Sequence, residues 1–393
     1  MADSNLAQLA YTVEDSYNEA PNSGDTLTTL RYTSESLSFD ITNTASQEIR
    51  SDRSAADLIQ TGAAISGGFN FELSATSYDD FIAGAMYSAW STPLNGATAI
   101  TISSAATAST ISSTASNLLQ NVSVGQWIKV TGLGTATTVN YFRVTGITSA
   151  TTVTVFPAPI LQAAGSTCSI KGCVIRNGIT ETSFAIEKKI AVNSATATNV
   201  FFQYSGLIVG SMAISAKSDA ILTGSFEFMG ASPGVSDTTA FSTTVTAAST
   251  TAVLNATSNV GGVYEGSPMV AIANCLIQGI DISINNNLRA IKGIGSIAAC
   301  DVGVGQCDVT GSIAAYFFDK SLYTKYIAGT ESAISFRTID STGKGFVFTL
   351  PRIKFETDKT NVGGSNQDIM ENLTYRALND SVSGCSIQID KFT

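Results

Sequence analysis

One stretch of this chain occurs twice: Gly67-Gly68-Phe69-Asn70-Phe71-Glu72-Leu73, followed by Ser77-Tyr78-Asp79-Asp80-Phe81-Ile82-Ala83-Gly84. The second copy reads Thr310-Gly311-Ser312-Ile313-Ala314-Ala315-Tyr316, followed by Ser321-Leu322-Tyr323-Thr324-Lys325-Tyr326-Ile327-Ala328-Gly329. In both copies a glycine precedes a serine by ten residues, and both copies end in Ile-Ala-Gly. An internal repeat determines the architecture of a chain. The symmetry indicates assembly rather than catalysis.

The repeat extends beyond this stretch. Residues 37–86 correspond to 280–329, and three later segments recur in the same order. These are Ser183–Glu187 with Ser335–Ile339, Val200–Tyr204 with Phe346–Leu350, and Ile221–Gly230 with Ile369–Leu378. Apolar and polar residues alternate in much of this sequence, which is typical of strands with one buried face. Each half is predicted to hold a strand, a polar arm, a strand, a short helix and three more strands.

A short helix is predicted after the glycine-rich strand of the first half. Ser77 is a candidate N-cap, and Asp79 and Asp80 favour the positive end of the helix dipole. The residues expected to pack through this helix are Tyr78, Phe81, Ile82, Met86 and Trp90. Their helical spacing favours packing against a sheet, and a ligand-binding aromatic box is the alternative.

The first half is interrupted by an insert at residues 95–176, which has no counterpart in the second half. It is rich in Ser, Thr and Ala and has strand-like pieces, so we predict a small β-sandwich grafted onto a loop. Trp127 is expected to anchor its core. The predicted domains are 1–94 plus 177–235, the insert 95–176, and 236–393.

Charged residues gather in the two polar arms. The first arm carries Glu48, Arg50, Asp52, Arg53 and Asp57, and the second carries Arg289 and Lys292. One interpretation is a pair of solvated hairpin loops. The other is a protruding arm that docks on a neighbouring subunit through paired charges.

The composition excludes several classes of function. The net charge is −10, so the chain lacks the basic surface that binds nucleic acid by neutralising phosphates. Histidine is absent, which removes Ser-His-Asp and Cys-His catalysis and histidine metal ligands. Only 13% of residues are charged, against about a quarter in most soluble domains, so much of the surface is predicted to be neutral or covered by other subunits.

Six cysteines are present, and their spacing does not match a zinc site. Buried thiols in a reducing compartment are the favoured interpretation, with disulfides as the alternative. The first residues lack the features of a secretory signal, and no run reaches the length of a membrane span. We therefore expect synthesis in a cytoplasm and no membrane partner. Catalytic residues, cofactors and metals are not expected.

The sequence resembles the tail tube proteins of long-tailed bacteriophages of the siphophage type. The resemblance covers most of residues 10–235 and, more weakly, the rest. It rests on an ordered combination of segments: Arg50–Arg53, Ala56–Leu58, Gly62, Ser66–Leu73, Tyr78–Phe81, Val124–Gly132, Phe142–Thr145, Phe202–Val209 and Ile221–Gly230.

The resemblance implies a mainly β fold. Two tandem tail-tube modules are implied, each a β-sandwich or half-barrel with a short flanking helix, together with an inserted immunoglobulin-like β-sandwich. Modules of this kind close into rings, and the rings stack into a tube that conducts double-stranded DNA without binding it specifically. The implied partners are other copies of the chain, the tape measure protein, and the tail-tip and tail-terminator proteins. The implied location is the tail of the virion, after synthesis in the host cytoplasm.

The duplication makes the ring prediction more specific. If each chain supplies two of six modules, three chains form a ring with pseudo-sixfold symmetry, and a hexamer is the second choice. The insert is expected on the outside, since in the lumen it would block the DNA path.

Three alternatives remain open from the sequence. A surface or adhesin-type β-protein would have a similar Ser/Thr/Ala-rich composition. A carboxylate-based glycosidase would need only acidic pairs, and Asp79-Asp80 is the adjacent pair available. A minor tail-tip or terminator protein would share the tail but occur in few copies.

Overall fold

The computed structural model describes residues 4–393 except 23, 104–108, 114–117, 133–140, 158–161, 194–197, 231, 237–238, 267–268, 273–275 and 363. Strands dominate this part of the chain, which confirms the prediction of a mainly β fold. Two short helices are present, α1 (Asp79–Met86) and α2 (Ser321–Ala328), after a 3-10 turn at Ser4–Leu6. All strand pairings in the described part are antiparallel except one, between β16 and β2.

The first half forms a sheet in the order β4–β5–β14–β13. The bounds are Ser38–Ala45 for β4, Leu58–Glu72 for β5, Thr223–Gly230 for β14 and Thr198–Lys217 for β13. The short β3 (Ser34–Glu35) continues β4 along the same side of β5. Gly68 allows the close approach of β5 to β14, because a Cβ there would lie 1.9 Å from the carbonyl oxygen of Phe226.

The second half repeats this sheet in the order β19–β22–β25–β24. The bounds are Ile277–Asn285 for β19, Asp308–Tyr316 for β22, Met370–Ala377 for β25 and Gly345–Asn361 for β24. Even the irregularities recur. The register of β13 against β14 shifts between Val209 and Ser211, and that of β24 against β25 shifts between Phe355 and Thr357. The repeat in the sequence is therefore a repeat in structure.

The two halves join through one strand pair, which we call the internal seam. The second part of β13 pairs with β19 from Ser211 opposite Asn285 to Lys217 opposite Gly279. The seam makes one eight-stranded sheet in the order β4–β5–β14–β13–β19–β22–β25–β24. Its two ends are β4 and the second part of β24.

A second layer of strands covers one face of this sheet. In the first half it contains β12 (Ser183–Asn193), β1 (Gln8–Val13), β2 (Thr26–Thr29), β16 (Thr244–Thr246) and β15 (Ser232–Ser236). In the second half it contains β23 (Ser332–Ile339), β17 (Val260–Glu265), β18 (Val270–Ile272) and β26 (Gln388–Phe392). β1 pairs with β12 as β17 pairs with β23. One hydrophobic core fills the space between the layers in both halves.

Helix α1 lies in this core. Tyr78, Phe81, Ile82 and Met86 are each at most 1% exposed, and Phe81 contacts the rings of Tyr11 and Phe184 at centroid distances of 4.5 and 4.8 Å. The helix is shorter than the apolar stripe suggests, because Tyr87 adopts a left-handed conformation and ends it. Trp90 lies beyond the end and donates its indole N–H back to the carbonyl of Asp79.

The predicted cap is wrong. Ser77 does not cap α1, and its hydroxyl instead accepts a hydrogen bond from Ser74 at 2.7 Å. Asp79 has a further role besides its place at the helix start, because it pairs with Lys391 of β26 at 2.8 Å. Burial raises the pKa of Asp79 despite this partner. The pair ties the helix of the first half to the last strand of the second.

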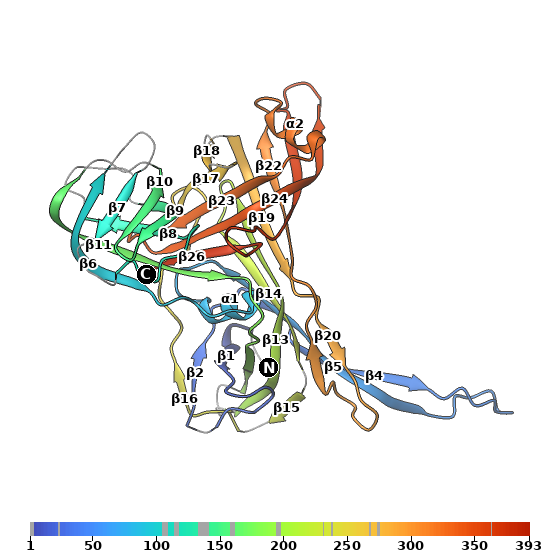
Figure 1. The fold of residues 1–393 in the computed structure, drawn as a ribbon. Helices are drawn as coiled ribbons and strands as arrows, with labels where there is room; N and C mark the ends of the chain where they lie inside the picture. Colours follow the sequence, from blue (N-terminus) through green and yellow to red (C-terminus); the bar gives the residue numbers. More distant parts are fainter. Residues whose placement is uncertain are drawn as a thin grey trace.

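The insert is a small β domain with a closed strand arrangement (Figure 1). Its strands are β6 (Leu94–Ser103), β7 (Thr110–Ser113), β8 (Trp127–Thr131), β9 (Tyr141–Ser149), β10 (Thr152–Phe156) and β11 (Gln162–Arg176). The pairings run β6–β7–β10–β9–β8–β11 and return to β6. The insert is therefore a six-stranded barrel rather than the two separate sheets of an immunoglobulin-like sandwich. Closure removes its free sheet edges.

Trp127 does not anchor the core of the insert, as the sequence had suggested. It is 1% exposed but packs against Val347 and Phe392 of the second half. Its indole N–H donates to the hydroxyl of Thr349 at 3.2 Å, and its backbone N–H donates to Asp390 at 3.0 Å. The insert has its own core around other residues. Trp127 therefore joins the insert to the second half.

Candidate functional site

The face of the eight-stranded sheet that points away from the core is polar. Side chains alternate across a strand, so each buried residue has polar neighbours on the other face. A hollow of about 790 Å³ lies over the middle of this face. Small polar or neutral side chains from six strands line it, among them Asn70, Ala213, Ser225, Ser283, Thr310 and Thr374. We call this surface the open face.

Several charges on the open face are already paired. Asp281 lies at the internal seam and accepts hydrogen bonds from Ser215 at 2.6 Å and Ser312 at 2.9 Å. Arg376 lies between Glu356 at 2.6 Å and Asp308 at 3.0 Å. Among the described residues of the open face, these pairings leave small polar groups and no basic patch.

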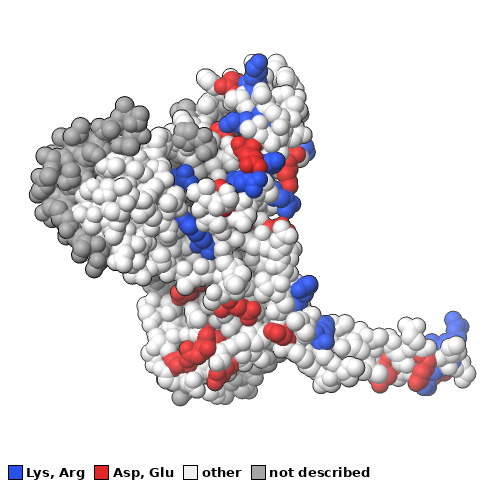
Figure 2. Space-filling view, viewed as in Figure 1, with Lys and Arg blue, Asp and Glu red and all other residues white. Residues whose placement is uncertain are grey.

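Charge is distributed unevenly over the rest of the molecule. Figure 2 shows acidic side chains over the part of the first half where Figure 1 places β1, β2 and β15. The loop between β1 and β2 contributes Glu14, Asp15, Glu19 and Asp25 to this region. On the face shown in Figure 2, basic and acidic side chains are interspersed over the second half, and the described part of the insert is nearly free of charge. The two ends of the molecule therefore differ electrostatically.

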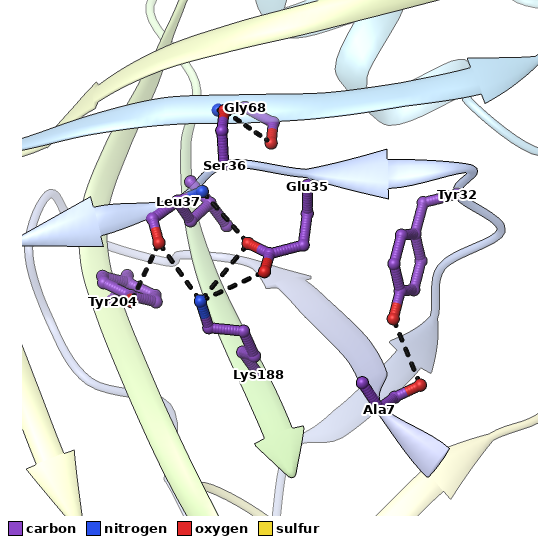
Figure 3. Close-up of polar contacts among 8 residues, drawn as sticks. All are labelled: Ala7, Tyr32, Glu35, Ser36, Leu37, Gly68, Lys188 and Tyr204. Atoms are coloured by element: carbon purple, nitrogen blue, oxygen red, sulfur yellow. Dashed lines mark hydrogen bonds and ion pairs between the residues drawn. The ribbon is translucent and has the colours of Figure 1, made fainter. Parts of the chain in front are cut away.

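The β4 edge of the sheet is partly covered by the chain itself. Figure 3 shows Lys188 of β12 below the bend at residues 35–37, on the side away from β5. Its Nζ atom contacts Glu35 at 3.2 Å and the carbonyl of Leu37 at 3.2 Å. The hydroxyl of Tyr204 donates to the same carbonyl, and the N–H of Leu37 donates to the Glu35 carboxylate at 3.0 Å. We call this group the edge cap.

The β24 edge carries two carboxyl groups close together. Glu371 on β25 is 2% exposed, and its Oε1 atom has no hydrogen-bond partner. The Oδ2 atom of Asp358 on β24 also lacks one. Burial and the neighbouring Asp358 raise the pKa of Glu371 to about 7. Glu371 is buried and Asp358 is half-buried, and no described cation forms an ion pair with either, so we call these two residues the acidic pair.

Two arms project from the same side of the sheet (Figure 1). The longer arm extends the β4–β5 hairpin, which closes through a bond from the N–H of Ser46 to the carbonyl of Asp57. The shorter arm contains β20 (Arg289–Ile291) paired with β21 (Asp301–Gly303). The N–H of Ala63 on β5 donates to the carbonyl of Ile297, so the arms are in contact.

All the charged residues predicted for the arms are exposed, namely Glu48, Arg50, Asp52, Arg53, Asp57, Arg289 and Lys292. Arg50 pairs with Asp52 of the same arm at 3.0 Å, and this lowers the pKa of Asp52. Sequence reasoning overlooked the apolar residues of the arms. Ile49 and Ile294 are fully exposed, and Leu58 is 64% exposed. Their exposure indicates a docking surface that is partly apolar.

The described cysteines, Cys168, Cys173, Cys300, Cys307 and Cys385, are free thiols, and Cys275 lies outside the described residues. Within the described ranges, no three His, Cys, Asp or Glu residues come together as a metal site would require. No helix in these ranges has the length and apolar character needed to cross a membrane.

A duplicated antiparallel β module with two sheet ends and two projecting arms defines a self-assembling structural protein. The chain matches the family described as phage tail tube protein over residues 4–377, and it belongs to that family. It is therefore a structural protein of the phage virion, and it assembles with itself into the tail tube. Proteins of this family are in general not enzymes. No curated protein matches the chain.

Proposed function

We propose that the chain forms the tail tube of a siphophage-type virion by closing rings through β24 and β4. The internal seam carries this proposal. β19 is the counterpart of β4, and β13 is the counterpart of β24, so the β13–β19 pairing is the model for a pairing between β24 and β4 of the next copy. Such a contact is head-to-tail and closes into a ring when the rotation allows. Closure also removes both sheet ends, which are otherwise sites of aggregation.

The exposed apolar residues near the two ends support this pairing. At the internal seam, Asn286 follows β19 and donates to the carbonyl of Ala85 in the last turn of α1. The residue of β4 in the corresponding position is Ile41, which is 44% exposed. The last turn of α2 carries Ile327, which is 65% exposed. Thr330 is the counterpart of Ala85, so ring closure would place Ile41 at the C-terminal end of α2, close to the turn that carries Ile327.

Three chains per ring is the number we propose, with a hexamer of whole chains as the second choice. Each chain contributes two equivalent modules, so three chains give pseudo-sixfold symmetry. Their sheets would together form a barrel of three times eight strands. Barrels of about 22 strands already enclose a whole plug domain, so this barrel would leave an open channel.

The open face would line the channel. Double-stranded DNA would pass over small polar groups and paired charges without specific binding, because no basic patch retains its phosphates. During assembly the same channel would hold the tape measure protein, and the ends of the tube would contact the tail-tip and tail-terminator proteins. The protein would be made in the host cytoplasm and would not contact a membrane.

The division into 1–94 plus 177–235, 95–176 and 236–393 remains our proposal for the domains. The insert belongs on the outside of the tube. The chain enters and leaves the insert just after α1, on the face of the sheet that carries this helix. There, Ser91 donates its N–H to the carbonyl of Val174. That side is opposite to the open face. Proteolysis of assembled tubes should cut residues 95–176 before the tube modules, and the reverse order would place the insert elsewhere.

The arms would mediate stacking between rings. Reversing Arg50 and Arg53 to glutamate should shorten or abolish tubes while leaving the monomer folded, because both side chains are exposed and make no core contact. Circular dichroism would check the fold, and negative-stain images would give the tube length. Tubes of normal length would remove these arginines from the stacking contact.

Rotational symmetry decides the ring proposal. Purified protein is assembled, and the mass of single rings and the symmetry of end-on views are measured. Three chains with strong sixfold features are expected. Six whole chains in a ring would overturn the argument from duplication, and the absence of rings or tubes would overturn the closing contact itself.

A further inference from the structure

The two sheet ends differ from the internal seam in a way that involves charge. On the core-facing side of the internal seam, Met212 and Ile214 of β13 lie opposite Ile284 and Ile282 of β19, so this side of the contact is apolar. At the β24 end, Asp358 takes the place of Met212, since each opposes the corresponding residue of the neighbouring strand. The ring-closing edge therefore carries an acid where the internal seam carries a methionine.

The second acid follows from the same comparison. Glu371 opposes Thr360 on β24, as Gly224 opposes Ile214 on β13. Glu371 therefore occupies a position that the first half leaves without a side chain. Helix α2 lies over the pair, and the backbone of Tyr323 donates a hydrogen bond to Glu371. Two carboxyl groups in this environment require a shared proton or a cation.

The opposite end of the sheet holds a lysine that has no counterpart in the second half. The strand pairings align Lys188 with Phe336, since Lys188 opposes Phe202 of β13 as Phe336 opposes Phe348 of β24. In the second half, the pairing of β13 with β19 occupies the region that the edge cap fills. Side chains of Lys188 and Glu35 are 15% and 23% exposed, so the pair is largely buried in the free chain. The edge cap satisfies backbone groups of Leu37 that would otherwise be free to pair with another strand.

Ring closure would compete with the edge cap. Leu37 corresponds to Ile282, because Ser38 opposes Ser66 as Ser283 opposes Thr310. With the register of the internal seam, Leu37 would lie opposite Thr360 of the next copy, and Phe39 would lie opposite Asp358. The backbone of Thr360 would then take the hydrogen bonds that Lys188 and Glu35 now make with Leu37.

We propose that Lys188 exchanges partners when the ring closes, leaving Glu35 for the Asp358 and Glu371 carboxyl groups of the neighbouring copy. This inference rests on the proposed ring contact. Asp358 is two residues from Thr360 on the same face of the sheet, and the flexible four-carbon stem of a lysine spans such a distance. The exchange supplies a cation to the acidic pair, which ring closure would otherwise bury without a partner at high cost. It also keeps the β4 edge covered until a correct partner displaces the cap.

Zero-length carbodiimide cross-linking tests the exchange, because it joins a lysine to a carboxylate only in direct contact. Full-length chains, half of them isotopically labelled, are cross-linked before and after assembly and analysed by mass spectrometry. Unassembled chains should give Lys188 joined to Glu35 within one chain. Assembled rings should give Lys188 joined to Asp358 or Glu371, with mixed labels. If assembled rings retain only the Glu35 link, the exchange is wrong while the ring proposal stands.

Charge reversal provides the second test. Lys188→Glu should lower the assembled fraction at least tenfold. Adding Asp358→Lys should restore the assembled fraction to within twofold of that of the natural protein, because it restores an ion pair between neighbouring copies. Adding Glu35→Lys restores an ion pair only within the edge cap, so it should not restore assembly. The melting temperature of each variant reports whether it folds. Rescue by Glu35→Lys and not by Asp358→Lys would show that Lys188 acts only within its own chain. If the natural protein forms no rings, the proposed function itself fails.

Discussion

Replacing Trp127 by alanine tests the joint between the insert and the second half. The side chain is 1% exposed and packs on Val347 and Phe392. Truncating a buried Trp typically costs about 3–5 kcal/mol, which includes the cavity left behind. Here the lost hydrogen bond to Thr349 is part of that cost. Because Trp127 lies outside the core of the insert, the whole loss should fall on the joint.

Hydrogen exchange measured by mass spectrometry would locate the loss. A penalty of about 3–5 kcal/mol corresponds to roughly 150- to 4,000-fold faster exchange where opening of the joint controls it. Amides of β26 and of the end of β11, which pair from Cys173 to Arg176, should show this increase. Amides of β9 and β10 inside the barrel should keep their protection.

Phe142→Ala is the matched control, because Phe142 is also 1% exposed but lies in the core of the insert. It should remove protection from β9 and β10. If Trp127→Ala removes the protection of these two strands as strongly as Phe142→Ala does, then Trp127 belongs to the core of the insert and the reasoning is refuted.

Two further predictions concern the modules. Gly68→Ala should destabilise the fold by about 3 kcal/mol, the upper end of the usual cost of overpacking, because its new Cβ would meet the carbonyl oxygen of Phe226. Gly24→Ala is the control: open space surrounds Gly24, so the melting temperature should not change. In the folded state, the pKa of Glu371 is raised to about 7. The folded state therefore holds the proton of Glu371 more tightly than the unfolded state does, and this proton stabilises the fold at low pH. The stabilisation is lost as the pH rises from about 4.5 to about 7. Urea unfolding at pH 5 and pH 8 would measure how much the free energy of unfolding changes between these two pH values. This change should differ by about 3 kcal/mol at most between the natural protein and Glu371→Gln. An equal change in both proteins would contradict the raised pKa of Glu371.

The sequence alone determined the features that depend on local pattern. Alternation of Phe69 and Phe71 with polar residues predicted a strand, and the recurrence near Gly311 predicted a second module. These signals are local because the side-chain period of a strand is set by its backbone geometry. The charged composition of the arms likewise predicted their exposure. The resemblance of the ordered segments to tail tube proteins agrees with the family that the chain matches.

The tertiary structure alone decided which distant residues meet. Lys188 and Glu35 are far apart in the sequence, and the crossing of the two strand layers brings them together at the sheet edge. Trp127 has the pattern of an ordinary buried strand residue, so nothing local shows that its partners lie in the second half. Closure of the insert into a barrel depends on the pairing of β11 with both β6 and β8. Strand pairing is non-local, so local propensity determines that strands form while packing determines which strands pair and which edges remain open.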